Sequence, residues 1–267
     1  MVMTNLWNTY VWHHPERVSR LIMLVYCVLF PGTLITIFLD AIPENARWFG
    51  GLLMTIQGVS VIAWMFHYHG SRAFYPIAAV LLGSCTIEYV GATTGFPFGS
   101  YSYTTVLSPR ILDTVPIAIL FAWMMVIAGA WYTGRILINS SSRVVRAVLT
   151  GLFVMIIDIQ IEPVATHINQ YWEWYDSGPY YGVPTVNFAG WWAVGFILGY
   201  ICDPYFVRIN ASDAHVVPLI AVVGSYIMFA SMTYMHGYYI ATIVALAMTV
   251  VTWVGLSRVR AHQMQGS

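Results

Sequence analysis

Long apolar segments recur along the whole chain, separated by shorter polar or aromatic stretches. Eight of them fall at residues 19–39, 49–69, 73–93, 114–136, 145–168, 186–207, 216–235 and 238–257. Each is close to the roughly 20 apolar residues that an α-helix needs to cross the hydrocarbon core of a bilayer. The pattern predicts an all-α fold, a polytopic transmembrane helical bundle of about eight spans, in a single transmembrane domain covering residues 1–267.

Composition indicates lipid, and not water, as the solvent around most of the chain. The 267 residues are 59% hydrophobic and 8% charged, whereas a typical soluble domain has about 25% charged residues. The net charge is zero and no basic stripe is present, which argues against a nucleic-acid partner. The first apolar segment lacks a small-residue cleavage site, so we expect it to stay as a span and not to be removed as a signal peptide.

The arginines fall unevenly between the two sides that eight spans define. Nine lie on one side, namely Arg17, Arg20, Arg72, Arg135, Arg143, Arg146, Arg208, Arg258 and Arg260. The other side has two, Arg47 and Arg110. Because cytoplasmic loops are enriched in Lys and Arg, the first side is predicted to be cytoplasmic. Both termini then face the cytoplasm, and the chain is predicted to be a multi-pass protein of the cytoplasmic membrane.

Two long loops on the arginine-poor side are rich in Gly, Pro, Tyr and Trp. They cover about residues 95–113 and 169–186. Gly and Pro favour defined turns, so we expect structured extracytoplasmic loops and not slack tethers. The pair is placed to cover the outer end of the bundle.

Three carboxyl groups fall inside the predicted spans: Glu88, Asp158 and Glu162. A carboxylate at the centre of a membrane helix costs about 2.5–3.5 kcal/mol on insertion scales, so such residues usually mark function. Asp158 and Glu162 are four residues apart and share one face of a helix. At about 1.5 Å of rise per residue, all three carboxyls lie roughly 20–26 Å from the cytoplasmic start of their helix. We therefore expect them to meet in the outer half of the bundle.

Carboxyl groups that lie close together in a low dielectric cannot all ionise. At least one of the three is expected to stay neutral, which places a general acid beside a general base. Pro163 adds to this chemistry, because its missing N–H frees the carbonyl of Ile159 and creates a place for water. The alternative is a structural role, in which the carboxyls hydrogen-bond neighbouring helices. Asp203, near the cytoplasmic end, is expected to be an interfacial capping residue.

Aromatic and amide side chains near the outer ends of the spans are candidates for binding a substrate. They are Tyr101, Tyr103, Trp172, Trp174, Tyr180, Tyr181 and Asn187. The alternative is that the rings belong to the belt that Trp and Tyr form at membrane interfaces.

The histidines do not indicate a metal centre. Membrane di-iron enzymes use several histidines at three- and four-residue spacing, whereas His13 and His14 are adjacent and His67 and His69 are two apart. The three cysteines form no CxxC pair, and no phosphate-binding glycine loop occurs. We therefore expect no metal and no cofactor.

Three sequence blocks carry a resemblance to a known family. They are Glu88 followed by TTGFPFGSYSYT at 93–104, then Asp158-x-x-x-Glu162-Pro163, and then WEWYDSGPYYGVP at 172–184 followed by Asn187-Phe188-x-Gly190-Trp191. On these blocks the chain resembles the CruF-type carotenoid 1,2-hydratase family. Where that family has Leu-Gly-Pro, this chain has Leu-Ser-Pro at 107–109.

The resemblance implies a cofactor-independent lyase of isoprenoid metabolism that adds water across the terminal C1–C2 double bond of an acyclic carotenoid end group. Family substrates are lycopene-like or γ-carotene-like ends, or the C50 precursor of bacterioruberin. The implied roles are Asp158 as the acid and Glu162 or Glu88 as the water-binding base, with the assignment reversible. Aromatic rings of the loops would stabilise the cation, at about 0.5–2 kcal/mol each. The expected partners are the carotenoid, the lipid bilayer and other membrane enzymes of the carotenoid pathway.

Three other functions are compatible with the same residues. Intramembrane carboxylates also serve proton-coupled transporters and channels, which would need further polar groups on a path to the cytoplasmic side. A different lipid-modifying enzyme, such as an isomerase, would use the same acid and base. A non-catalytic carotenoid-binding protein would retain the pigment unchanged.

Overall fold

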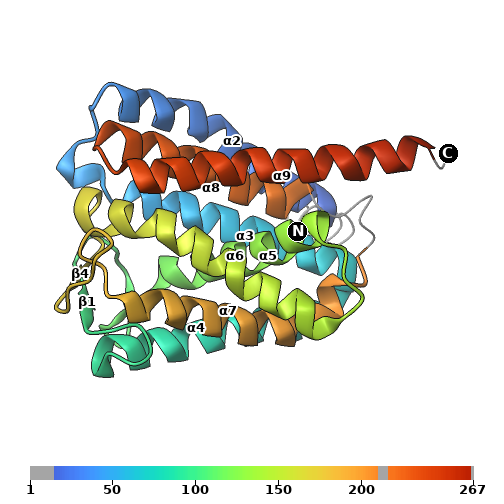
Figure 1. The fold of residues 1–267 in the computed structure, drawn as a ribbon, viewed down its shortest axis with the longest axis horizontal. Coiled ribbons are helices and arrows are strands. Elements are labelled where there is room, and N and C mark those ends of the chain that lie inside the picture. Colours follow the sequence, from blue (N-terminus) through green and yellow to red (C-terminus); the bar gives the residue numbers. More distant parts are fainter. Residues whose placement is uncertain (1–14, 210–215, 266–267) are drawn as a thin grey trace, which may run out of the picture.

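The computed structural model describes residues 15–209 and 216–265 as a bundle of long helices (Figure 1). The helices are α2 (Pro15–Phe38), α3 (Phe49–His69), α4 (Phe74–Thr94), α5 (Ile117–Leu137), α6 (Arg143–Pro163), α7 (Thr185–Phe206), α8 (Val216–Met235) and α9 (Tyr239–Gln265). Four short strands lie in two of the connections: β1 (Tyr101–Tyr103), β2 (Arg110–Ile111), β3 (Val115–Pro116) and β4 (Trp172–Trp174).

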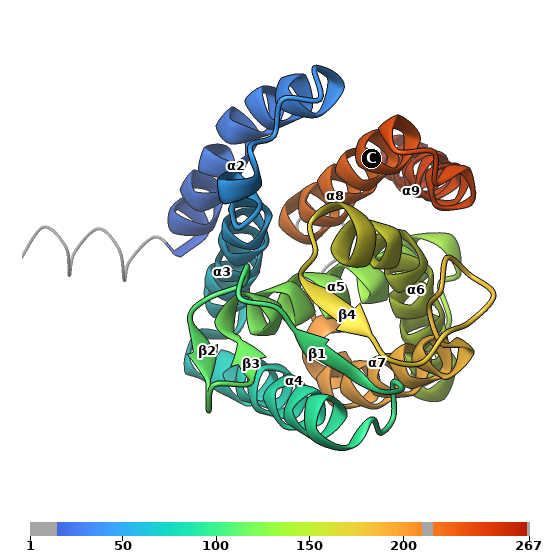
Figure 2. The same cartoon turned by 90° about the vertical axis from the view of Figure 1, so that its left-hand side faces the viewer.

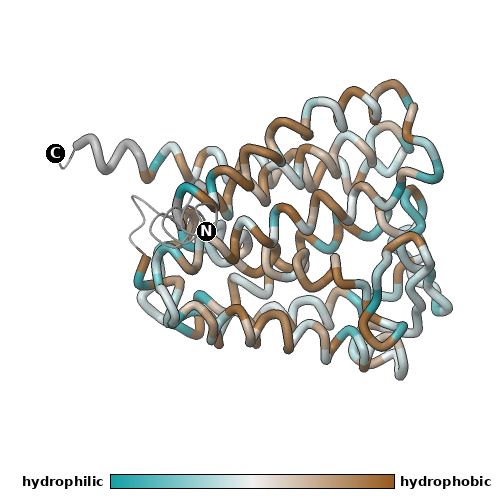
Figure 3. Tube along the Cα trace, turned by 180° about the vertical axis from the view of Figure 1, so that it is seen from behind, coloured by the Kyte–Doolittle hydropathy of each residue, from teal (hydrophilic) through white to brown (hydrophobic). Residues whose placement is uncertain are grey.

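Within the described residues, seven continuous helical stretches are long and apolar enough to cross a membrane. One of them, Glu44–Thr94, contains both α3 and α4, which meet at a 3-10 turn over Gly70–Ala73. Gly70 has a φ of 53°, which a glycine adopts without steric cost. Counting α3 and α4 separately gives the eight helices that the sequence predicts, so the all-α membrane bundle is confirmed. Hydrophobic residues dominate along the helices, and polar residues gather toward the two ends (Figure 3).

The two ends of the bundle differ in composition. The start of α2 and the end of α9 lie at the same end, together with the α3–α4 and α5–α6 connections, the end of α7 and the start of α8 (Figure 1). These connections and their flanks carry Arg72, Arg135, Arg143, Arg146 and Arg208. We call this the arginine-rich end, and the opposite end, which carries the strands, the loop end. The charge rule predicts that the arginine-rich end is cytoplasmic.

Helix α5 runs through the middle of the bundle (Figure 2) and is buried along nearly its whole length. It has no charged residue before Arg135, so other helices surround it without burying an unpaired charge. Near the arginine-rich end, the Trp131 and Tyr132 rings pack against Phe206 of α7, with ring centroids 5.4 and 6.0 Å away. These contacts tie α7 to the central helix.

Helices α6 and α7 pack closely because small residues face their contact. A Cβ atom at Gly195 would lie 2.7 Å from the Cβ of Val154, and one at Gly199 would lie 2.7 Å from the methyl carbon of Thr150. Small residues at four-residue spacing let membrane helices approach closely in this way. The contact also holds the start of α7 against the end of α6, where two of the three intramembrane carboxyls lie.

The two long loops meet at the loop end through an antiparallel pair of strands, β1 and β4. Tyr101 lies opposite Trp174, and Tyr103 lies opposite Trp172. Beside this ribbon the carboxylate of Asp176 accepts a hydrogen bond of 2.9 Å from the backbone N–H of Ser100. That bond favours the charged carboxylate and holds the pKa of Asp176 below its usual range.

The prediction that Asp203 is an interfacial capping residue is wrong. Asp203 is 1% exposed, and its carboxylate accepts hydrogen bonds of 2.6 and 2.7 Å from Nε and Nη2 of Arg146. The indole N–H of Trp131 donates a third bond of 2.9 Å to the same group. Asp203 is therefore half of a buried ion pair that joins α5, α6 and α7 near the arginine-rich end.

Candidate active site

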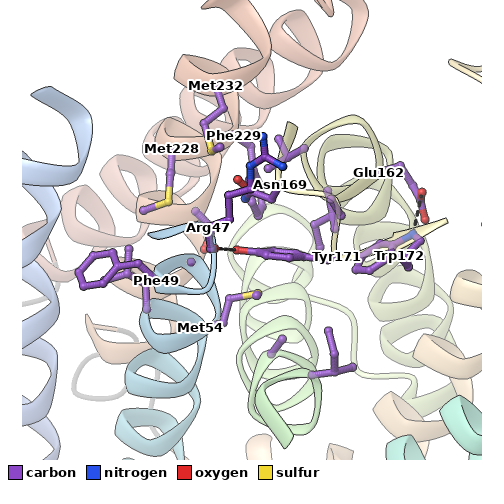
Figure 4. Close-up of a pocket in the computed structure, with 18 of the residues that line it drawn as sticks. Arg47, Phe49, Met54, Glu162, Asn169, Tyr171, Trp172, Met228, Phe229 and Met232 are labelled. Atoms are coloured by element: carbon purple, nitrogen blue, oxygen red, sulfur yellow. Dashed lines mark hydrogen bonds between the residues drawn. The ribbon is translucent and has the colours of Figure 1, made fainter. Parts of the chain in front are cut away.

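A cavity of about 460 Å³ lies between the helices toward the loop end. Its walls come from helices α2 to α8 and from the residues around β1 and β4, and most of its lining side chains are apolar. The size and the apolar walls are typical of sites for small organic molecules, which occupy roughly 300–1,000 Å³. Glu162 and Trp172 lie at one end of the cavity, and Phe49 and Met228 lie at the other (Figure 4).

Glu88 of α4 reaches the cavity from the middle of an otherwise apolar helix, and it is 3% exposed. Its Oε2 atom accepts hydrogen bonds of 2.7 Å from the hydroxyls of both Tyr101 and Tyr103. Its Oε1 atom accepts a bond of 2.8 Å from the indole N–H of Trp123 on α5. All three donors are neutral, so they stabilise a carboxylate while leaving its negative charge uncompensated.

The two tyrosines beside Glu88 keep their hydroxyl protons and so remain hydrogen-bond donors. Burial, together with the adjacent charge of Glu88, raises the pKa of Tyr101 and the pKa of Tyr103. A phenol already titrates near pH 10 in water. Both hydroxyls therefore keep their protons at physiological pH and continue to donate to Glu88.

Glu162 of α6 lines the same cavity and is 1% exposed. Its Oε2 atom accepts a hydrogen bond of 2.9 Å from the indole N–H of Trp174 and a longer contact of 3.4 Å from that of Trp172. Its Oε1 atom accepts a bond of 3.0 Å from the side-chain amide of Asn187 on α7. Like Glu88, this carboxyl is surrounded by neutral donors.

Asp158, one turn before Glu162, has fewer partners and is fully buried. Its Oδ2 atom accepts a bond of 2.7 Å from Nδ2 of Asn187, while its Oδ1 atom and the Oδ1 atom of Asn187 have no hydrogen-bond partner. The same Nδ2 atom also donates to Oε1 of Glu162, so the two carboxyls lie side by side. Two carboxyl groups this close in a low dielectric cannot both ionise, so we expect at least one of the pair to carry a proton. Glu162 lines the cavity, whereas Asp158 is not among its lining residues.

The strand pairing explains how the donors reach their carboxyls. Side chains alternate between the two faces of a strand, so Tyr101 and Tyr103 of β1 point toward Glu88. Trp172 and Trp174 of β4 point the same way, toward Glu162. The residues between them, Ser102 and Glu173, lie on the opposite and more exposed face. These four predicted substrate-binding residues, and Asn187 as a fifth, are thus cavity-lining residues that also donate to the carboxyls.

Two further tryptophans form a wall that sequence patterns did not single out. The rings of Trp123 on α5 and Trp191 on α7 stack with centroids 4.4 Å apart and planes 16° apart, and both line the cavity. Phe98 packs against Trp191 with centroids 6.3 Å apart. Trp123 sits in a wholly apolar span, where nothing distinguishes it from a packing residue. Trp191 falls within the resembling region, but only the structure places its ring in the cavity.

Tyr180 and Tyr181 were also predicted to bind a substrate, but they are not among the cavity-lining residues. The hydroxyl of Tyr180 donates a hydrogen bond of 2.7 Å to the carbonyl of Ile159. This is the carbonyl that Pro163 leaves without its helical partner. A tyrosine hydroxyl therefore fills the position that the sequence assigned to water. The hydroxyl of Tyr181 accepts a bond of 3.2 Å from the backbone N–H of Ile240.

Replacing Tyr180 with phenylalanine is expected to weaken the end of α6. The change leaves the carbonyl of Ile159 without its partner, which costs about 1 kcal/mol when the site is partly buried. The apparent melting temperature of the purified protein in detergent should fall. Tyr175→Phe is the control, because Tyr175 is 69% exposed and water replaces its bond to Ser102. Equal melting temperatures for both variants would contradict this role for Tyr180.

No group of three or more His, Cys, Asp or Glu side chains in the described ranges is arranged to hold a metal ion. His67 and His69 end α3 at the arginine-rich end, away from the cavity. His13 and His14 lie outside the described residues. Carboxyls, aromatic rings and amides are among the side chains that line the cavity.

The fold and the site together define an integral membrane protein with an apolar cavity bordered by buried carboxyl groups. Comparison with known proteins gives the family. The chain belongs to the family of carotenoid biosynthesis proteins, whose model matches residues 49–252.

Among individual proteins, the chain is similar to a bisanhydrobacterioruberin hydratase of Haloarcula japonica. The two are 31% identical over 162 residues, which cover 60% of this chain and 54% of the relative. The match thus spans about half the length of that protein. No solved structure matches the chain.

Proposed function

We propose that this protein is a carotenoid hydratase, which adds water across the terminal C1–C2 double bond of an acyclic carotenoid end group. The name of the similar protein supports a hydratase. The observation that carries the proposal is the position of Glu162 and Glu88 on one apolar, aromatic-walled cavity, with Asp158 held beside Glu162 by Asn187. In an uncharged hydrocarbon, the double bonds are the groups on which an acid and a base can act.

The first step is proton transfer to C2 of the end group. Glu162 delivers the proton, because it is the member of the pair that lines the cavity. Asp158 lies beside it on the same helical face and returns a proton to it. The sequence favoured Asp158 as the acid, with Glu162 or Glu88 as the base; the cavity lining favours the reverse assignment, with Glu162 as the proton donor and Asp158 as its reservoir. Asn187 donates to both carboxyls and so fixes their relative position.

Protonation at C2 leaves a tertiary cation at C1, which needs stabilisation in a medium of low dielectric. The stacked Trp123 and Trp191 rings present aromatic faces, each worth about 0.5–2 kcal/mol to a cation. Glu88 supplies a negative charge that no cationic side chain neutralises among its bonded partners. Both features act on the charge that develops in the transition state.

Water capture completes the reaction. A water molecule attacks C1, and its oxygen forms the new C–O bond. Its proton passes to Glu88, and the product is a tertiary alcohol. The proton returns to the Asp158–Glu162 pair through water, so the net change is the addition of one water without an oxidant, a reductant or a cofactor.

The transporter interpretation receives less support from the cavity. In the direction of the arginine-rich end, the polar lining of the cavity ends at Gln57 and Ser225. Asp203, an acidic group buried near the arginine-rich end, is paired with Arg146. Among the described residues, the lining therefore does not extend as a polar path from the carboxyls to the arginine-rich end.

Pigment analysis tests the proposal directly. The protein is expressed in hosts that make lycopene, γ-carotene or the C50 precursor of bacterioruberin, and the pigments are separated by liquid chromatography and weighed by mass spectrometry. We expect a more polar pigment, heavier by one water, in at least one host. Growth in deuterium oxide should place deuterium on C2.

The matched control is Asp158→Asn, which removes the proton reservoir while preserving side-chain shape. It should form the hydrated pigment at a rate lower by about 10²–10⁴-fold, the usual contribution of acid–base catalysis. Unchanged pigments in all three hosts, with wild-type protein present in the membrane, would refute the proposal. Retention of unchanged carotenoid on the purified protein would then favour a pigment-binding role.

A further inference from the structure

Toward the arginine-rich end, helix packing closes the cavity. The Tyr26 ring of α2 packs against Gly224 of α8, where an added Cβ atom would lie 2.6 Å from the tyrosine hydroxyl. Gln57 of α3 spans the same level and donates bonds of 2.9 Å to the carbonyl of Ala221 and 3.1 Å to the hydroxyl of Ser225. Helices α2, α3 and α8 are therefore joined below the cavity.

Toward the loop end, the cavity is covered by contacts around Arg47. The hydroxyl of Tyr171 donates a bond of 2.8 Å to the carbonyl of Arg47 (Figure 4). The guanidinium of Arg47 donates a bond of 2.5 Å to the side chain of Gln170. These bonds join the α2–α3 connection to the segment before β4 and cover the cavity from above.

Helices α2 and α8 stand apart at the loop end (Figure 2), and residues of both helices line the cavity. Its lining there comes from Gly32, Thr33 and Thr36 of α2 and from Met228 and Met232 of α8. Gly32 is exposed, and no atom lies within 4 Å of the position that its Cβ would take. The two helices that touch at Gly224 thus leave an open apolar gap further along.

We propose that the gap between α2 and α8 is the portal through which the polyene chain of the substrate extends into the lipid while its end group lies at the carboxyls. The inference rests on the proposed function. A conjugated chain is stiff and extended, and it is longer than a cavity of about 460 Å³ can enclose. The gap is continuous with the cavity and lined by short or flexible side chains, and methionines adapt readily to an apolar ligand.

The test narrows the portal from the α2 side. Gly32→Trp places an indole in the open space, and the helix tolerates it because glycine is the weakest non-proline residue in a helix. Ile35→Trp is the matched control, since Ile35 is on the same helix, 59% exposed and not among the cavity-lining residues. Each purified variant in lipid nanodiscs receives lycopene or geranylacetone, a short molecule with the same acyclic end.

We expect Gly32→Trp to lower the rate of lycopene hydration by at least about tenfold relative to Ile35→Trp, because the chain can no longer place its end at the carboxyls. Hydration of geranylacetone, which fits inside the cavity, should stay equal in the two variants. Equal rates of lycopene hydration in the two variants would overturn the portal proposal. An equal loss of lycopene and geranylacetone hydration in Gly32→Trp would overturn it as well. Failure of the wild-type protein to hydrate either compound would instead count against the proposed function.

Discussion

Glu162→Gln is expected to lose at least about 100-fold in the rate of hydration while the protein still accumulates in the membrane, because general acids contribute roughly 10²–10⁴-fold to such reactions. Glutamine keeps the shape of the side chain and an oxygen that accepts the bond from Trp174. It cannot release a proton to C2. It also removes a buried ionisable group, so the folded protein should lose little stability. Conversion of lycopene to its hydrate, normalised to protein in the membrane, measures the effect.

Glu173→Gln is the control for that experiment, because Glu173 lies between the two tryptophans of β4 and carries the same chemical change. Its side chain is exposed on the opposite face of the strand. Activity should therefore stay within about twofold of the wild type, as for most surface substitutions. A Glu162→Gln enzyme as active as Glu173→Gln would remove Glu162 from the chemistry and leave Asp158 and Glu88 to be tested as acids.

Helical periodicity and depth placed the three carboxyls in the same part of the bundle, but they did not determine which one faces the cavity. Residues four apart differ by about 40° around a helix axis. The neighbouring helix decides which of the two is covered, and here Asn187 of α7 packs against Asp158. Sequence alone does not state which helices pack together, so the ordering of Asp158 behind Glu162 was beyond it.

The donors to the carboxyls show the same limit. The alternation in Tyr101-x-Tyr103 and Trp172-x-Trp174 is a period-two pattern that indicates strands. These side chains reach the carboxyls only because two loops far apart in the sequence pair, and the sequence does not show that pairing. The sequence did not identify Trp123 as a cavity residue, because one indole in an apolar helix is compatible with packing alone. The number of spans could be predicted from the sequence, because each long apolar segment is recognised as a helix without knowing which helices pack against it.

Arg146→Ala is expected to destabilise the protein strongly without any contact with the cavity. It leaves the carboxylate of Asp203, which is 1% exposed, without its cationic partner. Removing one partner of a buried ion pair costs about 3–5 kcal/mol. The Arg146 side chain is 11% exposed, so we expect the variant to lose about 3 kcal/mol of stability, the low end of this range. The fall in the apparent melting temperature in detergent measures this loss of stability, and the gel-filtration profile of the protein is recorded beside it.

The pairing argument predicts that a second substitution will rescue the first. Asp203→Asn in the Arg146→Ala background removes the unpaired charge, and most of the lost melting temperature should return, because an uncharged amide still accepts the bond from Trp131. Arg143→Ala is the matched control on the same turn of α6. Its guanidinium stacks on the exposed Tyr200 ring at 3.7 Å and donates bonds of 3.1 and 2.7 Å to the Tyr200 carbonyl. These contacts are exposed and pair no buried charge, so their loss should cost clearly less than the loss of Arg146. If Arg143→Ala were as harmful as Arg146→Ala, or if Asp203→Asn worsened the single variant, then the arginine would act as a surface charge at the membrane face and not as the partner of a buried carboxylate.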